Sequence, residues 1–313
     1  MPGPPRRRVS RQQRADVGAQ LAADHCGLAH RRELRLAGVS RADVRSEVAA
    51  GRWTTAGRHT VVIGTGPPAG EGLLWQALWE TGAGATLDGV AALIAAGLTG
   101  FDADTIDVAV PANNRWRRVP GVTVHRRRDI GPVTGVGLVR CTSEYATIRA
   151  AQWACTDRTA ALLVCLAVQQ RLAAPTRLLT AWASIRRSPR RPLLDAVIRD
   201  VCDGAHSLGE LDFSRMCRRS GLPAPGRQVV RSAPGGRVYL DVAWEDIGLV
   251  VEIDGGHHAL ALNPVADALR QNEVTLSQEV VLRVPVLGLR LAPAAFMAQV
   301  VRAHRTLSRR RVA

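Results

Sequence analysis

Two apolar stretches near the C-terminus, RVYLDVAW (residues 237–244) and GLVVEID (residues 248–254), constrain the fold of this chain most strongly. Both are rich in strand-forming residues and only three residues separate them, which predicts a β-hairpin. With the turn centred in this short segment, Asp241 lies opposite Glu252, about 5 Å away between Cβ atoms. Asp254 follows two residues after Glu252 and shares its face of the strand, so three carboxylates are expected on one patch.

Carboxylates this close repel each other, so either one of them is protonated or a cation lies among them. A few carboxylate oxygens suit Mg²⁺ or Mn²⁺, which keeps its other positions for water and phosphate oxygens. Such a metal polarises a phosphodiester, lowers the pKa of a bound water and stabilises the leaving oxygen. Asp241 and Glu252 are therefore candidate metal ligands for phosphodiester hydrolysis, and His258 is a candidate proton carrier.

The charge of the whole chain points to a polyanionic partner. Its net charge is +15 over 313 residues, which favours nucleic acid. All 42 residues counted as Lys or Arg are arginines, so no mechanism here can use a lysine. The length allows two domains or more, and a hydrophobic content of 46% suits folded cores.

Cysteine spacing and hydropathy exclude several classes of protein. The six cysteines form no C-x-x-C pair, so neither a zinc ribbon nor a redox motif is indicated. Free thiols in a reducing compartment are expected instead. The basic N-terminus has no apolar signal region, and no apolar run is long enough to span a bilayer. The sequence therefore predicts a cytoplasmic protein without membrane contact.

The N-terminal region has the pattern of a basic arm followed by a winged-helix-like domain. Residues 1–20 are rich in Pro and Arg and predict a disordered arm. In residues 21–66, a helix begins at Ser40 and ends at Gly51, and two short strands follow. This order places the second helix and its arginines against the major groove of duplex DNA. The candidate contacts are Arg41, Arg45 and Arg52.

The rest of the chain divides into a middle region and a C-terminal domain. In the middle region, residues 67–203, TIDVAVP and GVTVHRRRDI alternate as strands do, and the composition from residue 143 onward favours several helices. The C-terminal domain, residues 204–313, opens with Ser207 and Glu210 in the S-x-x-E spacing of a capping box. An apolar helix face follows and ends near Gly221.

The C-terminal motifs also resemble a known family. Asp241, Glu252-x-Asp254-Gly255 and a histidine, followed by DALRQN and VVLRV, resemble the very-short-patch-repair-type branch of the PD-(D/E)XK nuclease superfamily. The match covers residues 203–301 and implies a restriction-endonuclease-like αβββαβ core. The N-terminal part more loosely resembles the winged-helix domain of AbiE-type antitoxins. The whole chain is thus expected to be of the α+β or α/β class.

The resemblance implies roles for individual residues. Asp241 and Glu252 match the metal-binding carboxylates, and His258 matches the family histidine. Asp254 stands where many relatives have a lysine. Either His258 takes over the role of that lysine, or turnover is weak or absent. The remaining matched positions are Glu210 for the acid of the entry helix, and Asp267, Arg270 and Asn272 for the helix after the core strands, where Arg270 could hold a phosphate.

Three functions are compatible with these features. The leading hypothesis is a metal-dependent, DNA endonuclease-like protein that docks on duplex DNA through its Arg-rich winged-helix region. The alternative is a non-enzymatic, antitoxin-like DNA-binding regulator with a degenerate nuclease fold, for which a toxin partner stays open. A third hypothesis is RNA binding, which the 4% aromatic content disfavours because single-stranded recognition relies on stacking side chains.

Overall fold

The computed structural model describes residues 9–134, 137–203, 213–225, 227–233, 237–254 and 281–312. The chain divides into two compact units, Met1–Thr142 and Ser143–Ala313. Helices and strands occur in both units, so the chain is of the α+β class, as the sequence predicts. The predicted boundaries at residues 66 and 203 fall inside these units, and the finer division into four parts stays a prediction.

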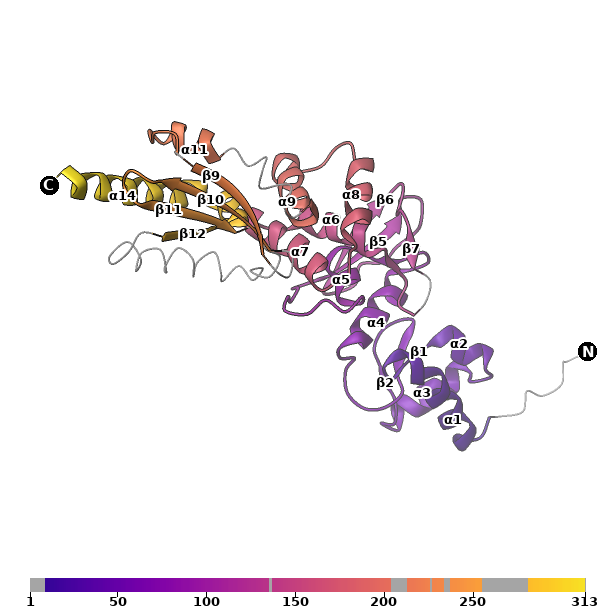
Figure 1. The fold of residues 1–313 in the computed structure, drawn as a ribbon. Coiled ribbons are helices and arrows are strands. Elements are labelled where there is room, and N and C mark those ends of the chain that lie inside the picture. Colours follow the sequence, from indigo (N-terminus) through magenta and orange to yellow (C-terminus); the bar gives the residue numbers. More distant parts are fainter. Residues whose placement is uncertain are drawn as a thin grey trace, which may run out of the picture. The chain divides into compact units, whose positions relative to one another are not determined.

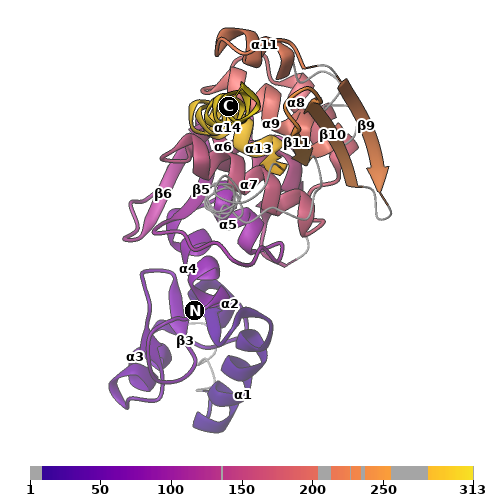
Figure 2. The ribbon, with the colours of Figure 1, turned by 60° about the vertical axis from the view of Figure 1, so that its left-hand side comes forward.

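The first unit begins with three helices and a small sheet. These elements are α1 (Arg11–Ala22), β1 (Leu28–His30), α2 (Arg31–Leu36), α3 (Arg41–Ala49), β2 (Thr54–Thr55) and β3 (Thr60–Val62). The strands form an antiparallel sheet in the order β1-β3-β2, and Figure 2 shows the helices grouped around β3. The shared buried core consists of Ala29, Leu34, Val39, Val44, Trp53 and Val61.

Local sequence explains where α3 begins and ends. The Ser40 hydroxyl accepts a hydrogen bond from the backbone N–H of Asp43, and the Asp43 carboxylate accepts one from the backbone N–H of Ser40. This reciprocal capping gives hydrogen-bond partners to backbone N–H groups at the start of α3, which have no partner within the helix. After the helix, Gly51 has a φ of 68°, a left-handed conformation that glycine adopts readily. The predicted helix limits and the two strands after it are confirmed.

The prediction of a disordered arm is wrong for residues 11–20, which belong to α1. Ser10 caps this helix, because its hydroxyl accepts from the backbone N–H of Gln13 and its own backbone N–H donates to the Gln13 side chain. Arg14 donates from Nε to Glu47 on α3 at 2.7 Å. Val17 and Leu21 also pack against the core of the unit. The core residues and Glu47 lie farther along the chain, so the local pattern of residues 11–20 does not show these contacts.

The rest of the first unit is built on a five-stranded sheet. Its elements are α4 (Glu71–Thr81), β4 (Thr86–Leu87), α5 (Gly89–Ile94), β5 (Ile106–Pro111), β6 (Val122–Arg127), β7 (Val133–Thr134) and β8 (Arg140–Cys141). The strand order is β6-β5-β4-β8-β7. The predicted strands TIDVAVP and GVTVHRRRDI are confirmed as β5 and β6, which pair in parallel. Helix α4 packs against both sheets of the unit, and it therefore connects them.

The second unit opens with a helical cluster, as the composition of residues 143–203 predicts. Its helices are α6 (Ser143–Trp153), α7 (Asp157–Gln169), α8 (Pro175–Ser184) and α9 (Arg191–Asp203). Their apolar faces meet in a buried core that includes Ile148, Val164, Leu178 and Trp182. The indole of Trp182 donates from Nε1 to Asp195 at 2.8 Å, which satisfies its polar group beside the core.

A four-stranded sheet follows in the second unit. Its strands are β9 (Arg227–Ala233), β10 (Arg237–Trp244), β11 (Leu249–Asp254) and β12 (Val281–Pro285), and α11 (Phe213–Arg219) precedes them. The order is β12-β11-β10-β9, with antiparallel pairing from β9 to β11 and parallel pairing of β12 with β11. The predicted hairpin register is confirmed, because Asp241 is the Cα partner of Glu252.

Helices α13 (Val286–Leu291) and α14 (Pro293–Val312) complete the second unit. Helix α14 runs along the sheet (Figure 1), where Phe296 packs in one buried core with Val251 and Ile253 of β11. Glu252 lies between these two buried residues, so it belongs to the other face of the strand. Helix α13 packs against α9, and Arg290 donates from Nε to Asp200 at 2.9 Å. The helical cluster and the sheet are thus joined within one unit.

None of the helices in the described ranges has both the length and the apolar character needed to cross a membrane.

Candidate nucleic-acid interface

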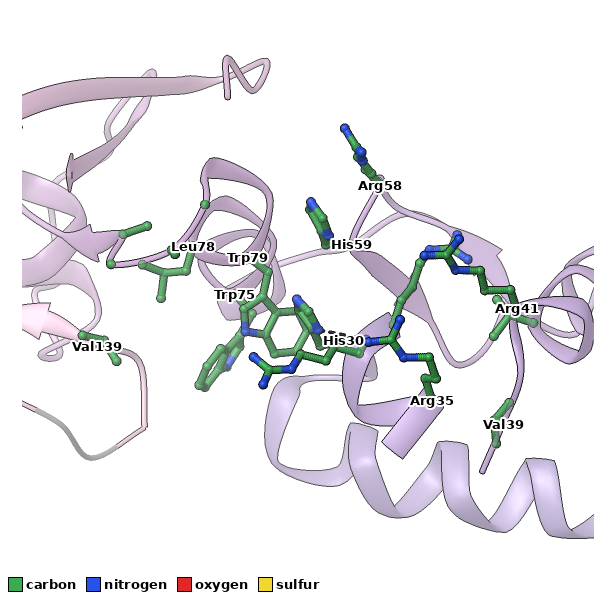
Figure 3. Close-up of a pocket in the computed structure, with 18 of the residues that line it drawn as sticks. His30, Arg35, Val39, Arg41, Arg58, His59, Trp75, Leu78, Trp79 and Val139 are labelled. Atoms are coloured by element: carbon green, nitrogen blue, oxygen red, sulfur yellow. Dashed lines mark hydrogen bonds between the residues drawn. The ribbon is translucent and has the colours of Figure 1, made fainter. Parts of the chain in front are cut away.

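Basic side chains gather in one groove of the first unit. Helices α2 and α3, the turn between β2 and β3, and α4 line this groove, which has a volume of about 1100 Å³. Figure 3 shows Arg35 and Arg41 toward one end and Leu78 and Val139 toward the other, with a group of aromatic rings between them. The groove therefore combines a basic end with an aromatic and apolar end.

Six arginines line the groove, three from α2, two from α3 and one from the turn. They are Arg31, Arg32, Arg35, Arg41, Arg45 and Arg58. All except Arg31 are exposed. Within the part of the chain that the structure describes, none of the six forms an ion pair with a carboxylate. The groove thus presents positive charge that no ion pair among the described residues neutralises.

The sequence of α3 explains how its basic residues reach the groove. Val44 is buried in the core and fixes the orientation of the helix. Arg41 and Arg45 are four residues apart, so they lie one above the other on the same side of the helix. Both line the groove, and their contact with DNA stays a prediction.

Glu47 on α3 is buried, and two arginines hold its carboxylate. Arg14 donates from Nε at 2.7 Å and Arg52 donates from Nε at 2.6 Å. The hydrogen bond from Arg52 is the main cause that holds the pKa of Glu47 below its ordinary value; burial acts against it, and the hydrogen bond from Arg14 adds to it. Arg52 therefore lies beyond the end of α3 in an internal ion pair, and the structure does not bring it into the groove with Arg41 and Arg45.

A buried carboxylate on α4 holds the turn between β2 and β3. Glu80 accepts hydrogen bonds from the backbone N–H of Arg58 at 2.9 Å, the backbone N–H of His59 at 2.6 Å and the hydroxyl of Thr60 at 2.9 Å. Arg117 adds an ion pair at 3.1 Å. Burial opposes the ionisation of Glu80, but these hydrogen bonds outweigh it, so the pKa of Glu80 lies below its ordinary value.

The same carboxylate explains the glycine in the turn. A Cβ atom at Gly57 would lie 2.4 Å from Oε1 of Glu80, closer than any real side chain can approach. Glycine at this position lets the backbone pass beside the carboxylate. Gly57 and Glu80 together fix the path of the turn, and they thereby place Arg58 and His59 at the groove.

Aromatic rings line the groove beside the turn. The rings of Trp75 and Trp79 on α4 have centroids 5.4 Å apart. His30 meets Trp79 edge to face at 5.4 Å and stacks on His59 at 5.9 Å. Its Nδ1 accepts a hydrogen bond from the backbone N–H of Arg32 and so caps α2. Burial is the main cause that lowers the pKa of His30, which keeps its ring neutral near pH 7.

Sequence reasoning missed the contributions of α2 and α4 to this site. The segment HRRELR carries a signal for α2, because a capping histidine is followed by Arg31, Arg32 and Arg35 on one short helix. Trp75, Trp79 and Glu80 have no comparable local signal. The partners of Glu80 lie about 20 residues earlier in the chain, and only the folded structure brings them together.

The predicted metal ligands lie on the sheet of the second unit. Asp241 on β10 is the cross-strand partner of Glu252 on β11, and Glu252 is in turn the partner of Arg283 on β12. Oε2 of Glu252 accepts a hydrogen bond from Nε of Arg283 at 3.2 Å. Asp254 lies two residues farther along β11, opposite Tyr239. The register thus brings the three acidic positions onto neighbouring strands and adds a cation that the sequence did not single out.

The other predicted site residues lie outside the described residues. They are Glu210, His258, Asp267, Arg270 and Asn272. For Asp241 and Asp254 the structure gives the strand positions alone. Within the ranges that the structure describes, no group of three or more His, Cys, Asp or Glu side chains is arranged to hold a metal ion. A divalent metal at Asp241 and Glu252 therefore stays a prediction.

Comparisons with known proteins assign no family to the chain. No protein-family model matches it, and no curated protein matches it. Among solved structures, the RV2827C protein from Mycobacterium tuberculosis aligns over 73% of this chain and 90% of that chain, with 14% sequence identity and a TM-score of 0.34. A likeness this weak does not define a shared fold.

Proposed function

We propose that this chain is a DNA-binding protein that docks duplex DNA on the basic groove of its first unit. The order α1-β1-α2-α3-β2-β3, with the sheet order β1-β3-β2, is that of a winged helix. In this arrangement α3 enters the major groove, and the turn between β2 and β3 approaches the backbone. Arg41 and Arg45 are then the contacts of α3, and Arg58 is the contact of the turn.

The observation that carries the proposal is the set of six groove arginines, none of which forms an ion pair with a carboxylate of the described residues. Arginine binds phosphate through two parallel hydrogen bonds, and it is the side chain best suited to duplex DNA. Arginines that form no such ion pair attract a polyanion such as DNA. When they bind its phosphates, the counterions of the DNA are released, which favours binding. In contrast, Arg14 and Arg52 are already paired with Glu47 and have an internal partner.

A pair of matched double variants tests this proposal. The Arg41→Ala/Arg45→Ala variant removes two groove charges, and Arg186→Ala/Arg187→Ala removes two exposed charges from the loop after α8. Both change the net charge equally. Fluorescence anisotropy with a labelled duplex is expected to show a loss of at least about tenfold in affinity for the first variant and less than about twofold for the second. Equal losses would mean that charge alone, and not the groove, drives binding.

A second candidate function is metal-dependent phosphodiester hydrolysis by the C-terminal sheet. Its specific support is the observed pairing of Asp241 with Glu252, on three antiparallel strands followed by a parallel fourth. This pattern is the one that the resemblance to PD-(D/E)XK nucleases implies. Asp241 and Glu252 would hold Mg²⁺ or Mn²⁺, which supplies polarisation of the phosphate when bound.

The ion pair between Arg283 and Glu252 bears on this candidate. Arg283 supplies a positive charge beside the carboxylates, on the neighbouring strand, in a chain that has no lysine. Its side chain is 71% exposed, and it could therefore contact a phosphate as well as Glu252. Under this candidate function, Arg283 would supply the positive charge that a lysine supplies in many relatives at the position of Asp254.

Plasmid nicking separates the two candidates. Supercoiled plasmid is incubated with Mg²⁺ or Mn²⁺ and either the wild type, Asp241→Ala or Glu252→Ala, with Asp246→Ala in the exposed hairpin turn as the control. Nicking by the wild type and the control alone supports hydrolysis. No nicking together with duplex binding supports a non-enzymatic DNA-binding regulator. Equal nicking by all four proteins would show contamination and remove the support for a catalytic sheet.

A further inference from the structure

The groove also contains aromatic side chains that the binding of duplex DNA does not require. Trp75 and Trp79 line it from α4, and both are only half-buried. Their rings are tilted by 43° with centroids 5.4 Å apart. Both therefore leave part of their ring surface accessible from the groove. Tryptophan is also the residue on which unpaired nucleobases stack well.

A half-buried cation lies in the same groove. Arg31 follows His30, the ring that contacts Trp79, and its backbone N–H donates to the carbonyl of His59 at 2.8 Å. Its guanidinium donates to the hydroxyl of Thr55 at 3.3 Å. Burial is the main cause that lowers the pKa of Arg31, and the charge of Glu80 acts against it. No carboxylate among the described residues forms an ion pair with Arg31. An arginine in this position has donors left for an anion, because guanidinium carries five N–H groups.

A planar base and a phosphate are the two groups that such a site would hold. We propose that the tryptophan end of the groove binds an unpaired nucleotide of a strand that leaves the duplex held by α3, with its base on Trp75 and Trp79 and its phosphate on Arg31. This inference rests on the proposed DNA-binding function and specifies its substrate as a junction between duplex and single strand.

The extent of the groove favours a strand over a free nucleotide. Its volume of about 1100 Å³ lies at the upper end of the range of about 300–1,000 Å³ that pockets for one small ligand occupy. The unneutralised arginines continue from Arg31 to Arg35 and Arg41, as Figure 3 shows for the latter two. A single nucleotide would leave most of them without a phosphate. A strand that runs from the tryptophans to α3 would neutralise them all.

Three DNA ligands test the inference. The first is a blunt labelled duplex, the second carries a short thymidine overhang, and the third carries an overhang of abasic residues with the same number of phosphates. Wild-type protein is expected to bind the thymidine overhang about tenfold more tightly than the abasic one, because only the former can stack. Trp75→Leu and Trp79→Leu are expected to lose this preference, whereas Trp116→Leu, an exposed position outside the groove lining, keeps it.

A spectroscopic measurement avoids the risk that a tryptophan variant is misfolded. Two of the seven tryptophans lie in the groove, so the thymidine overhang is expected to quench part of the intrinsic fluorescence of the wild-type protein. The abasic overhang is expected to leave it unchanged. Thermal unfolding of each variant shows whether the fold is intact.

The outcomes separate this inference from the proposed function. Equal binding of thymidine and abasic overhangs by the wild type, with tight binding of the blunt duplex, overturns the inference and leaves duplex binding in place. A preference that both folded tryptophan variants retain also overturns it. Competition by micromolar thymidine monophosphate would identify a free nucleotide as the occupant and overturn the assignment to a strand. Failure to bind any of the three ligands overturns the proposed function and the inference together.

Discussion

The carboxylate of Glu80 accepts a hydrogen bond from the backbone N–H of His59 at 2.6 Å, and this contact ties α4 to the turn that carries part of the basic groove. Two further donors from the same segment, the backbone N–H of Arg58 and the hydroxyl of Thr60, share the carboxylate. A buried anion is stable only while such donors remain. The position of the turn is therefore determined by a residue of α4, which lies outside the group formed by α1, α2 and α3.

Removing this carboxylate is expected to destabilise the first unit. Glu80→Ala leaves the donors of the turn without their buried acceptor, and we expect the free energy of unfolding to fall by about 2–4 kcal/mol. Urea unfolding followed by circular dichroism measures the change. Glu71→Ala is the matched control, because Glu71 is exposed on the same helix, and its effect is expected to stay within about 0.5 kcal/mol. Similar losses in both variants would contradict the role of Glu80.

The Glu80 contact also predicts a dependence of stability on pH. The pKa of Glu80 in the folded protein is lower than its ordinary value of 4.5. Its stabilising contribution is therefore fully present above pH 4.5 and is lost as the pH falls through the lower folded value. Glu80→Gln does not titrate, so its deficit relative to the wild type is expected to shrink on acidification. A deficit that stays constant from about pH 6 to about pH 3 would show that Glu80 keeps an ordinary pKa.

Gly57 and Glu80 are expected to be energetically coupled. Gly57→Ala places a Cβ atom 2.4 Å from Glu80 Oε1, and we expect a loss of about 1–3 kcal/mol from the resulting displacement. The same substitution in the Glu80→Ala background meets no carboxylate and is expected to cost at least about 1 kcal/mol less. A double-mutant cycle of unfolding free energies measures this difference. Additive effects would show that the turn does not depend on the contact.

The parts of the fold that were predictable depend on local chemistry. The limits of α3 follow from Ser40, Asp43 and Gly51, which act within one turn of the helix ends. The pairing of Asp241 with Glu252 follows from the length of the turn, since turn length fixes the register of a hairpin. Both kinds of information are contained in a few consecutive residues, and sequence reasoning therefore captured them.

The basic groove depends on which arginines have acidic partners, and that information is not local. In the sequence alone, Arg45 within α3 and Arg52 just after it are equivalent candidates for contact with DNA. Arg45 lines the groove, whereas Arg52 donates to Glu47, which is also held by Arg14 of α1. A pattern of charges along the chain cannot distinguish a paired arginine from an unpaired one. The fold is needed because the pairing residues lie up to 33 positions apart.

The cysteines are expected to fall into two classes of reactivity. Burial raises the pKa of Cys165 to about 12 and is also the main cause that raises the pKa of Cys217 to about 12, so both are neutral thiols at pH 8. Cys26 and Cys155 are exposed. We expect a chromogenic disulfide reagent at pH 8 to modify the exposed pair quickly and the buried pair only after unfolding. A Cys26→Ser/Cys155→Ser/Cys202→Ser variant keeps only the buried thiols of Cys141, Cys165 and Cys217, and rapid modification of this variant would contradict their burial.

The salt dependence of the affinity for DNA tests directly whether the groove arginines contact phosphates. If they contact phosphates, the affinity for duplex DNA falls steeply between about 50 and 200 mM salt, with a logarithmic slope of about −0.9 for each phosphate neutralised. Arg41→Ala/Arg45→Ala is expected to reduce the magnitude of this slope by up to about 2, because each lost phosphate contact removes about one unit. Arg186→Ala/Arg187→Ala is expected to leave the slope unchanged, since those arginines lie outside the groove lining. An affinity that does not change over this range of salt would rule out a phosphate-dominated interface, and an unchanged slope in the groove variant would place Arg41 and Arg45 away from the DNA backbone.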